Sequence, residues 1–549
     1  MVRALLLHRR GRRFESCSAH LRRPGGAGFV LAMLRTLILL PIVFLAACQT
    51  PSPEDAPTQA ATSTPQPSVT PRFTPTPLPT LAATPNIEQN SQAEAMLPEF
   101  QGDARSFPDA THYWIDVNVD FDPRREVGTI EGLSRIQFTN PHDEPLSDIV
   151  LMLWPNDRQY RAEAQAGPAL IDGQLVAGQP ELEGLAQRYD LPAPLEPGDT
   201  LDLSVPFSIS IAGLIEEGNV HRFGITEGVL FAPTFYPLVP RLMDGEWDAR
   251  TAPIIGDTTV SDVALYQVRI TAPSDQTLVA TGAELDRELL EAGRVATTFA
   301  SGPVRDFAFA LGPFITKMEQ VNGITINGWA LPEHEEDLGV MVGAAATQLD
   351  LLSELIGLYP YTELDLVDVP GAFGGIEYPG LVSIGTLGGG NVIDPTVHEV
   401  GHQWFYGLIG DDQHEEPWLD EAAASYTQVL YHEQASRRGY ATGMLTFFRD
   451  QVRDHPNPER PIGHAVEDYD TWADYGLFVY RKGALFFDAL RGEMGDDLFF
   501  EFLQRFYDQH RYEIATAVDF QSTAEATCAC DLDALFDLWV FEGGEIPGS

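Results

Sequence analysis

Apolar and polar residues alternate along many short stretches between Thr111 and about Gly312. The clearest alternation runs through residues 112–120, 134–138 and 266–271, and Asn-Pro, Gly and Asp residues typical of turns separate such stretches. A period of two places the apolar side chains on one face of a β-strand. The pattern therefore predicts a large antiparallel β domain in this part of the chain.

The pattern changes at about Thr316. Two further strands are predicted at residues 324–330 and 364–369, and after them apolar residues recur with the spacing of amphipathic helices. Such helices are predicted near Leu351, at residues 444–453 and at residues 532–540. A mixed α+β domain is therefore expected after the β domain, and the chain is long enough for two or three domains.

The first 48 residues are predicted to be a leader rather than part of the fold. An apolar stretch at residues 37–45 ends in Leu-Ala-Ala-Cys, which resembles the lipobox of bacterial lipoproteins and would make Cys48 the lipidated first residue. The stretch is too short to span a bilayer and is typical of a signal sequence. The Arg-rich segment before it is unusual for a signal, so Met33 is the expected start and residues 1–32 an upstream extension.

Residues 49–98 are rich in Pro and Thr and nearly free of charge and of large apolar side chains. Such a segment cannot bury a core, so it is expected to be an extended, disordered stalk with polyproline-like backbone. At ~3.1 Å per residue it would reach on the order of 100 Å from the membrane. The leader and the stalk together predict a lipid-anchored protein of the cell envelope, outside the cytoplasm.

The chain is strongly acidic, with 34 basic and 80 acidic residues and a formal net charge of −46. Such a surface repels nucleic acid and anionic lipid, so binding to nucleic acid is excluded and membrane contact is expected only through the anchor. Cationic peptide termini, in contrast, would be weakly attracted.

Two cysteines follow the leader, Cys528 and Cys530, and one residue separates them. That separation is too short for an unstrained disulfide in most backbones. The two are expected to be a free or strained pair without a catalytic role.

The most informative motif is His398-Glu399-Val-Gly-His402. Four positions of a helix put both imidazoles on one face, where they can bind one metal ion, and Glu399 projects beside them toward a metal-bound water. The alternative is a helix that carries two histidines by chance. Burial of such a pair without a metal or hydrogen-bond partners is costly, which favours the metal.

Neighbouring residues favour a helix around this motif. Asp394 is predicted as the N-cap with Pro395 in the first turn, and Gly410 is predicted to end the helix. Between them apolar residues recur at roughly helical spacing, at positions 397, 400, 404, 405 and 408.

Glu421 is the candidate third ligand. Pro417 is expected in the first turn of a second helix, which would continue to about Arg438-Gly439 and place Glu421 near its start. The alternative is a surface carboxylate that compensates the helix dipole, and the adjacent Asp420 shows that acids occur here without being ligands.

Four segments together resemble the gluzincin aminopeptidases, the zinc peptidases related to aminopeptidase N and leukotriene hydrolase. Residues 398–406 and 418–421 match the zinc-binding segments at the family interval, residues 369–381 resemble the G-A-M-E-N exopeptidase motif with its flanks, and residues 480–483 resemble the Y-x-K-G segment. Tyr475 also stands where several members carry a tyrosine. With weaker similarity included, the resemblance covers roughly residues 105–545.

The resemblance implies that His398, His402 and Glu421 bind one zinc ion per chain. Glu399 would be the general base that takes a proton from the metal-bound water and later delivers it to the leaving amine. Zinc brings the pKa of that water near neutrality, and a carboxylate within hydrogen-bond reach completes the activation.

By the same resemblance, Tyr480 would stabilise the oxyanion of the tetrahedral intermediate, and Glu377 would pair with the free α-ammonium of the substrate beside Gly374 and Gly375. Without the resemblance, Tyr480 lies in an aromatic stripe that is typical of a core, and Glu377 lies in a Gly- and Pro-rich stretch that is typical of a turn.

The exopeptidase motif departs from the family pattern at two positions. Ile376 stands in place of Met, a mild change, and Tyr378 stands in place of Asn, which exchanges an amide for a bulky phenol. The preferred first residue of the substrate is therefore not transferable from the family.

The resemblance also implies an architecture. Residues 99–315 would form an antiparallel β saddle or sandwich domain, and residues 316–549 a thermolysin-like α+β catalytic domain. The C-terminal helical domain of many relatives is expected to be missing, which would leave the active site open to longer peptides.

The predicted function is therefore a zinc-dependent aminopeptidase that removes N-terminal residues from peptides with a free N-terminus. One alternative is a zinc endopeptidase or other hydrolase that does not select an amine. The other is a non-catalytic scaffold lipoprotein, although every expected ligand and catalytic residue is present. The sequence does not indicate an oligomeric state.

Overall fold

The computed structural model describes residues 91–107, 109–213, 222–371, 374–435 and 438–546. The chain divides into two units, Met1–Phe73 and Thr74–Ser549, and every described residue belongs to the second. The leader with Cys48 and the first part of the stalk lie outside the described residues, so the predictions for them remain predictions.

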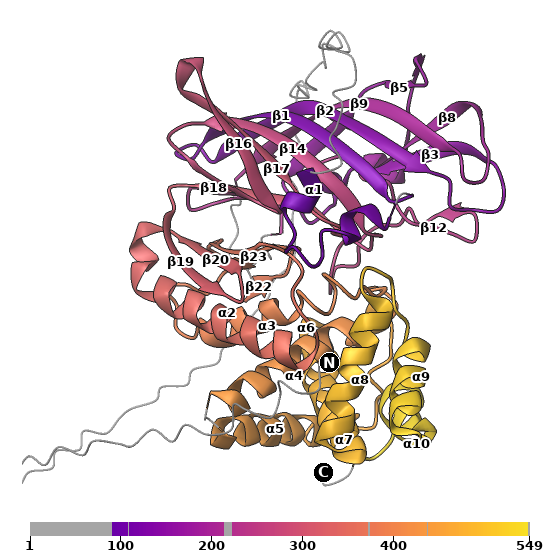
Figure 1. Ribbon diagram of the computed structural model, residues 1–549, viewed down its shortest axis with the longest axis vertical. Helices are drawn as coiled ribbons and strands as arrows, with labels where there is room; N and C mark the ends of the chain where they lie inside the picture. Colours follow the sequence, from indigo (N-terminus) through magenta and orange to yellow (C-terminus); the bar gives the residue numbers. More distant parts are fainter. Residues whose placement is uncertain (1–90, 108, 214–221, 372–373, 436–437, 547–549) are drawn as a thin grey trace, which may run out of the picture. The chain divides into compact units, whose positions relative to one another are not determined.

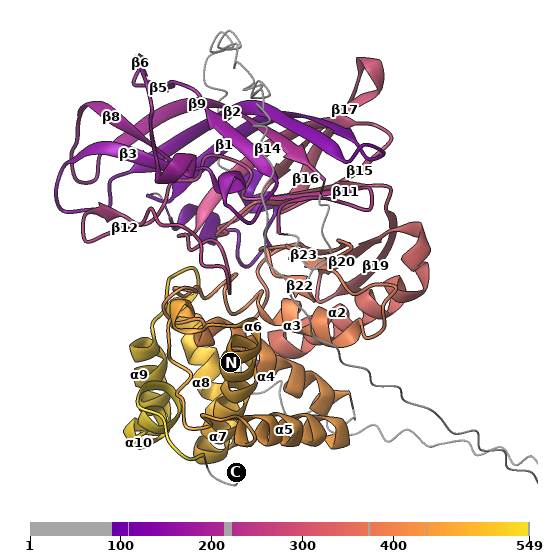
Figure 2. The same cartoon turned by 180° about the vertical axis from the view of Figure 1, so that it is seen from behind.

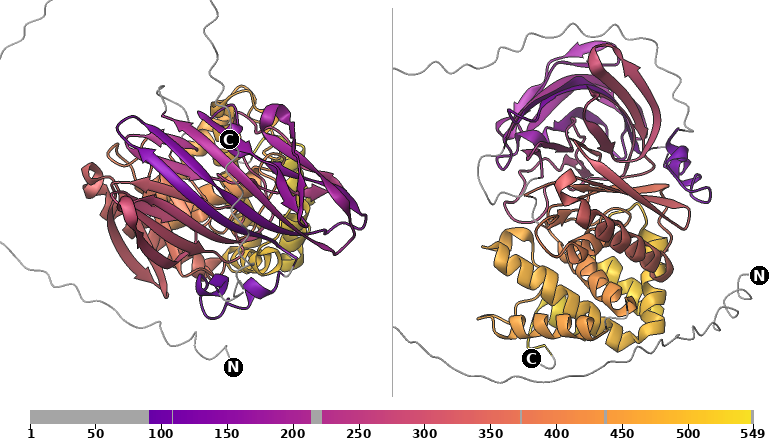
Figure 3. Two further views of the ribbon diagram at one scale, coloured as in Figure 1. Left: turned by 90° about the horizontal axis from the view of Figure 1, so that it is seen from above. Right: turned by 90° about the vertical axis from the view of Figure 1, so that its left-hand side faces the viewer.

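The β domain is built on one nine-stranded sheet, whose long strands lie side by side in Figures 1 and 3. In pairing order the strands are β16 (Ala283–Leu290), β17 (Arg294–Ala300), β14 (Ala264–Pro273), β1 (Thr111–Asp122), β2 (Val127–Thr139), β9 (Thr200–Ala212), β5 (Ala169–Ile171) and β6 (Gln174–Val176), and β4 (Ala162–Ala166) also pairs with β9. The predicted alternation is real: along β9, alternate side chains are buried. The sheet is not purely antiparallel, however, because β1 and β14 run parallel at its centre.

Three smaller sheets complete this domain. They comprise β3 (Leu146–Met152), β8 (Ala186–Leu195) and β7 (Gln179–Glu181); then β10 (Gly224–Thr226), β11 (Val229–Pro233), β18 (Ala308–Gly312) and β15 (Thr277–Ala280); and finally β12 (Leu242–Met243) and β13 (Glu246–Trp247).

Asp306 lies just before β18 and is fully buried. It accepts hydrogen bonds from the Thr234 hydroxyl, from the Tyr236 hydroxyl at 3.3 Å and from the Phe307 N–H at 2.6 Å. Burial nevertheless raises the pKa of Asp306 to about 7, and the hydrogen bonds only partly oppose this rise. The folded protein therefore holds a proton here that the unfolded chain releases near pH 4.

A pH-dependent stability follows from this carboxyl group. An acid whose folded pKa is raised stabilises the fold fully below its unfolded pKa, and this contribution is lost as the pH rises from about 4 to 7. Relative to Asp306→Asn, we expect the wild-type protein to lose up to about 4 kcal/mol of unfolding free energy across this window. Urea denaturation midpoints of both proteins at four pH values test this prediction, and Asp275→Asn, at an exposed position, is the control. A difference in stability between Asp306→Asn and wild type that does not change with pH would refute it.

The second domain begins with a five-stranded sheet. Its strands are β19 (Ile315–Val321), β20 (Ile324–Ala330), β21 (Glu363–Asp368), β23 (Leu381–Ile384) and β22 (Gly375–Ile376) in pairing order. Helix α2 (Glu335–Leu355) packs against β19 and β20 (Figure 1). Residues 332–355 are long and apolar enough to cross a membrane by length and composition, the one such helix among the described residues. However, 61 % of its apolar 18-residue window is buried within the protein.

Helices form the rest of the chain, and Figure 2 shows α8 and α9 side by side, as their contacts require. They are α3 (Ile393–Gly401), α4 (Trp418–Gln434), α5 (Arg438–Arg453), α6 (Trp472–Tyr475), the π-helical η8 (Gly476–Lys482), α7 (Gly483–Met494), α8 (Asp496–His510), α9 (Ala517–Cys528), α10 (Asp533–Phe536) and the π-helical η9 (Asp537–Phe541). The predicted order, a β domain followed by an α+β domain, is confirmed.

The boundaries predicted for α3 were wrong at both ends. The helix starts at Ile393, where the Asn391 side chain accepts the Ile393 N–H at 3.2 Å, and the Asp394 carboxylate instead contacts His432 at 2.7 Å. It ends at Gly401 rather than Gly410, and the backbone soon turns left-handed at a φ of 94° at Tyr406. A helix cannot continue through that conformation.

Helix α4 is also shorter than predicted. It ends at Gln434, and α5 begins separately at Arg438. The apolar periodicity continues across the break because both helices pack on the same core, so it does not reveal the break itself.

The C-terminal end of the predicted stalk belongs to the folded body. Residues 91–94 form α1 (Ser91–Glu94), and Met96 and Leu97 are buried. The Leu97 N–H donates to the Pro360 carbonyl at 2.9 Å, and the Thr362 N–H donates to the Ala95 carbonyl at 3.0 Å. Pro and Thr are scarce in this short stretch, and its apolar side chains suffice to anchor it.

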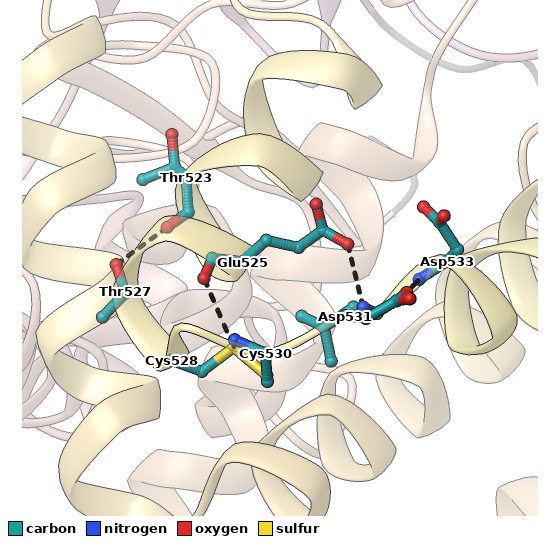
Figure 4. The surroundings of a disulfide bond; sticks show 8 residues. Thr523, Glu525, Thr527, Cys528, Cys530, Asp531 and Asp533 are labelled. Carbon is teal, nitrogen blue, oxygen red and sulfur yellow. Dashed lines mark hydrogen bonds between the residues drawn. A yellow bond between two sulfur atoms is a disulfide. The ribbon is translucent and has the colours of Figure 1, made fainter.

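Cys528 and Cys530 form a disulfide, so of the two alternatives expected from the sequence, a free or a strained pair, the free pair is wrong. Their Cα atoms are 5.1 Å apart, within the usual range for a disulfide. Ala529 between them adopts a left-handed conformation at the end of α9, which turns both side chains to the same side. Figure 4 shows the pair beside Glu525.

Candidate active site

Three predicted ligands converge where α3 meets the first turn of α4. The Nε2 atoms of His398 and His402 are 3.1 Å apart. Glu421 Oε2 lies 3.1 Å from the first of these nitrogens and 3.3 Å from the second. All three side chains are buried.

This triangle of atoms fits a zinc ion. Ligands held about 2.0–2.1 Å from a tetrahedral zinc would lie roughly 3.3 Å from one another, close to the observed separations. Two imidazoles and one carboxylate are also one of the donor sets of catalytic zinc sites, which keep a fourth position for water or substrate. The convergence that the sequence predicted is therefore present, and Glu421 is not a surface carboxylate.

Asp420 supports His402 from the side opposite the other ligands. Its Oδ1 contacts His402 Nδ1, and its Oδ2 accepts a hydrogen bond of 2.7 Å from the Gln413 side chain. Burial would lower the pKa of His402, but the carboxylate of Asp420 raises it above its ordinary value. In the sequence, Asp420 was interpreted as an acidic residue of the first helical turn without a role at the metal. The one feature of the sequence that could have indicated its role is its position next to the candidate ligand Glu421.

Replacing Asp420 with Asn should weaken metal binding about 10- to 100-fold, because carboxylates that hold a ligand imidazole fix its tautomer and increase its basicity. Zinc affinity measured by competition with a chromophoric chelator tests this. The exposed Asp497→Asn, which changes a first-turn acid of α8, is the matched control. Equal affinities of Asp420→Asn and wild type would contradict it.

Glu399 is buried beside the metal ligands. One of its carboxylate oxygens lies within 4.8 Å of ligating atoms of both His402 and Glu377. Gly375 makes this position possible, because a Cβ there would lie 2.5 Å from Glu399 Cγ and 2.7 Å from the Ser383 carbonyl. Burial raises the pKa of Glu399 to about 8, and His402 partly opposes this. A nearby cation would help to keep the carboxylate ionised.

Tyr480 reaches the same site from η8. Its hydroxyl donates to Glu421 Oε1, and its ring stacks on that of His398 with 5.6 Å between centroids. Burial raises the pKa of Tyr480 above its ordinary value, and the Glu421 charge adds to this, so the phenol stays a hydrogen-bond donor. A π-helical turn often marks a functional site. Tyr475 packs edge-on against Tyr480, fully buried.

Glu377 follows β22 directly and is 94 % buried rather than exposed on a turn. The Gln403 side chain holds its segment twice, donating to the Glu377 carbonyl at 3.1 Å and accepting the Gly380 N–H at 2.9 Å. Burial raises the pKa of Glu377, and Asp257 adds to this. Gly374, at a φ of 73°, turns the chain into this segment and accepts the Gly385 N–H through its carbonyl.

A small cavity adjoins Glu377, and the β domain supplies part of its wall. Arg222 and Asp257 form a buried ion pair of 2.5 Å there. Asp257 also lies within 4.8 Å of both Glu377 and Asp420. Sequence reasoning missed these residues, because nothing near Arg222 or Asp257 in the chain marks them. The lining residues are Arg222, Asp257, Thr258, Thr259, Ile376, Glu377, Tyr378, Tyr406 and Gln413.

Parts of the chain are similar to known peptidases. Residues 388–539 match the Peptidase family M1 domain. Aminopeptidase B of Mus musculus is 29 % identical over 35 % of this chain and 32 % of its own length, and aminopeptidase M1 of Arabidopsis thaliana is 25 % identical over 36 % of this chain and 25 % of its own. The matched stretches thus span a third or less of these relatives.

Solved structures show the same fold. The M1 zinc metallopeptidase of Deinococcus radiodurans has a TM-score of 0.62 at 20 % identity, covering 80 % of this chain and 95 % of its own. A mutant of it bound to a Tyr-Ser-Ala substrate has a TM-score of 0.61 at 19 % identity with the same coverage. Residues 388–539 thus carry a peptidase family M1 domain, and the solved structures show that the chain shares the fold of M1 zinc metallopeptidases.

Proposed function

We propose that this protein is a zinc-dependent aminopeptidase with one zinc ion per chain, which cleaves the first residue from peptides with a free N-terminus. The main support for this proposal is the position of the Glu377 carboxylate. Its buried carboxylate lies beside Glu399 and His402 and does not belong to the triangle of candidate ligands around His398. A buried carboxylate needs a cationic partner, and the α-ammonium of a peptide would supply one.

The roles of the other residues follow from their positions. When bound, a zinc ion would polarise the scissile carbonyl and increase the acidity of water. Glu399 would take the proton of the attacking water and return it to the leaving amine. Tyr480 would donate its phenol hydrogen to the oxyanion of the tetrahedral intermediate.

Amine selection is tested with paired substrates. We expect hydrolysis of alanyl-p-nitroanilide and none of its N-acetyl derivative, and loss of both activity and metal with a chelator. In Glu377→Gln, kcat/KM for the free amine should fall about 10- to 100-fold, the range of one charge-assisted contact. Equal hydrolysis of the acetylated and free substrates would instead favour a hydrolase that does not select an amine.

The same proposal includes a lipid-anchored place in the cell envelope, supported by the apolar stretch 37–45 and the lipobox ending in Cys48. Expression in a bacterial host with labelled palmitate should label the protein, and Cys48→Ala should abolish the label and move the protein to the soluble fraction. Unchanged membrane association of Cys48→Ala would contradict the anchor.

A further inference from the structure

The cavity beside Glu377 lies where the first side chain of a substrate must go. In an aminopeptidase the ammonium held by Glu377 and the first side chain are bonded to the same Cα, so the side chain starts next to this carboxylate. Asp257 lies within 4.8 Å of Glu377, and both line the cavity together with Tyr378. The cavity walls therefore decide which first residue is accepted.

The room in this cavity is small. Its side chains leave about 10 Å³, enough for about one water molecule. Two tyrosines, Tyr378 and Tyr406, line the cavity, and both residues are more than nine-tenths buried. The Tyr406 ring is confined by this burial, and its backbone is fixed by a hydrogen bond of 2.8 Å from Arg305 to the Tyr406 carbonyl.

Tyr378 is held as firmly. Its ring packs edge-on against Phe231 with 5.6 Å between centroids, inside an apolar cluster that also contains Val229 and Val367. A swing of this ring would leave a void in a close-packed core, which is costly. The family motif has an asparagine here, without a ring to fill the space.

The charges of the cavity disfavour an ionised first side chain. Arg222 and Asp257 already neutralise one another at 2.5 Å, and both side chains are about nine-tenths buried. An added carboxylate would meet Asp257 and Glu377. An added cation would meet Arg222, while both carboxylates already have a cationic partner: Arg222 for Asp257, and the substrate ammonium for Glu377. An unpaired charge in a buried site is strongly unfavourable. Thr258 and Thr259 add neutral side chains to the lining.

We infer that the cavity accepts only small, uncharged first residues, those with the side chains of glycine, alanine or serine, and that Tyr378 sets the size limit. The inference rests on the proposed aminopeptidase function and names its substrate class. Each methylene that a pocket cannot hold changes discrimination by about 10- to 200-fold. The preference for alanine over leucine or phenylalanine should thus reach at least about 100-fold in kcat/KM.

A panel of aminoacyl-p-nitroanilides of Gly, Ala, Ser, Leu, Phe, Glu and Arg tests the inference. The wild-type protein should hydrolyse the first three and discriminate against the rest. Tyr378→Asn should raise kcat/KM for leucine at least about tenfold relative to alanine, whereas Phe447→Asn, which changes an exposed aromatic residue on α5, should leave the ranking unchanged.

Binding gives a second measurement that does not depend on turnover. Calorimetric titration of the Glu399→Gln protein should show tighter binding of alaninamide than of leucinamide. This measurement also tests the size limit if the Tyr378→Asn protein does not fold. Equal use or equal binding of the alanine and leucine compounds would overturn the inference, as would an unchanged ranking in a folded Tyr378→Asn. If instead the proposed aminopeptidase function were wrong, none of these compounds would be hydrolysed or bound, whatever the size of the first side chain.

Discussion

Glu399→Gln is expected to lower kcat/KM for aminoacyl amides about 100- to 10,000-fold while leaving the fold and the bound metal in place. Glutamine matches glutamate in shape, so it fits the space against Gly375, but its amide cannot take up the proton that a general base removes from water. Metal content should persist because Glu399 lies outside the triangle formed by His398, His402 and Glu421.

Steady-state kinetics measure kcat/KM, and mass spectrometry measures the metal content of the same protein. Glu493→Gln is the control, because Glu493 is an exposed glutamate on α7. If Glu399→Gln kept more than half of the activity, the general-base role would be lost. If it lost its metal as well as its activity, the loss of activity would no longer report on proton transfer.

Arg305→Met is expected to destabilise the fold by about 3–5 kcal/mol. The Arg305 guanidinium is buried and donates to three backbone carbonyls: Tyr406 at 2.8 Å, Ser261 at 3.0 Å and Glu513 at 2.6 Å. Methionine fills similar space but removes this donor from the carbonyls of Tyr406 and Ser261, whereas the Glu513 carbonyl keeps the Gly410 N–H at 2.9 Å. Each buried unsatisfied carbonyl costs about 1–3 kcal/mol. Tyr406 would also lose the contact that holds it beside the cavity.

Urea denaturation followed by tryptophan fluorescence measures the change in midpoint. Arg287→Met is the matched control, since Arg287 is half-exposed on β16 and pairs with Glu284 within its own strand. We expect that control to change stability by less than about 1 kcal/mol. Similar midpoints for Arg305→Met and Arg287→Met would show that the three carbonyl contacts contribute little.

Arg305 also explains why the helix prediction failed beyond Gly401. The apolar residues at 404, 405 and 408 have helical spacing, yet they are core side chains of an irregular loop. The loop is stabilised by a guanidinium from about a hundred residues earlier, which packs so close to Gly410 that a Cβ there would lie 2.2 Å from Arg305 Cζ. Gly410 is thus needed for this close approach rather than for a helix end. The apolar spacing of neighbouring residues does not reveal a contact with a residue so far away in the chain.

The disulfide and the end of the stalk are two further features that the local sequence pattern did not predict. A single left-handed residue, Ala529, decides whether Cys528 and Cys530 can meet, and the sequence does not reveal that conformation. Likewise the composition of residues 49–98 as a whole concealed that Met96 and Leu97 are buried against the folded body.

The pairing of His398 and His402 could be read from the linear chain because helical geometry is local: four residues make about one turn, so the two side chains share a face. The role of Glu421 came instead from the resemblance to a known family. The order of the two domains was readable for the same reason, since strand and helix periodicities are properties of neighbouring residues. Only the folded structure decided that Asp420 supports His402, that Arg222 and Asp257 from the β domain close the cavity beside Glu377, and how little room Tyr378 leaves there. Those contacts join residues far apart in the chain or depend on the direction of one side chain, and packing rather than local pattern determines both.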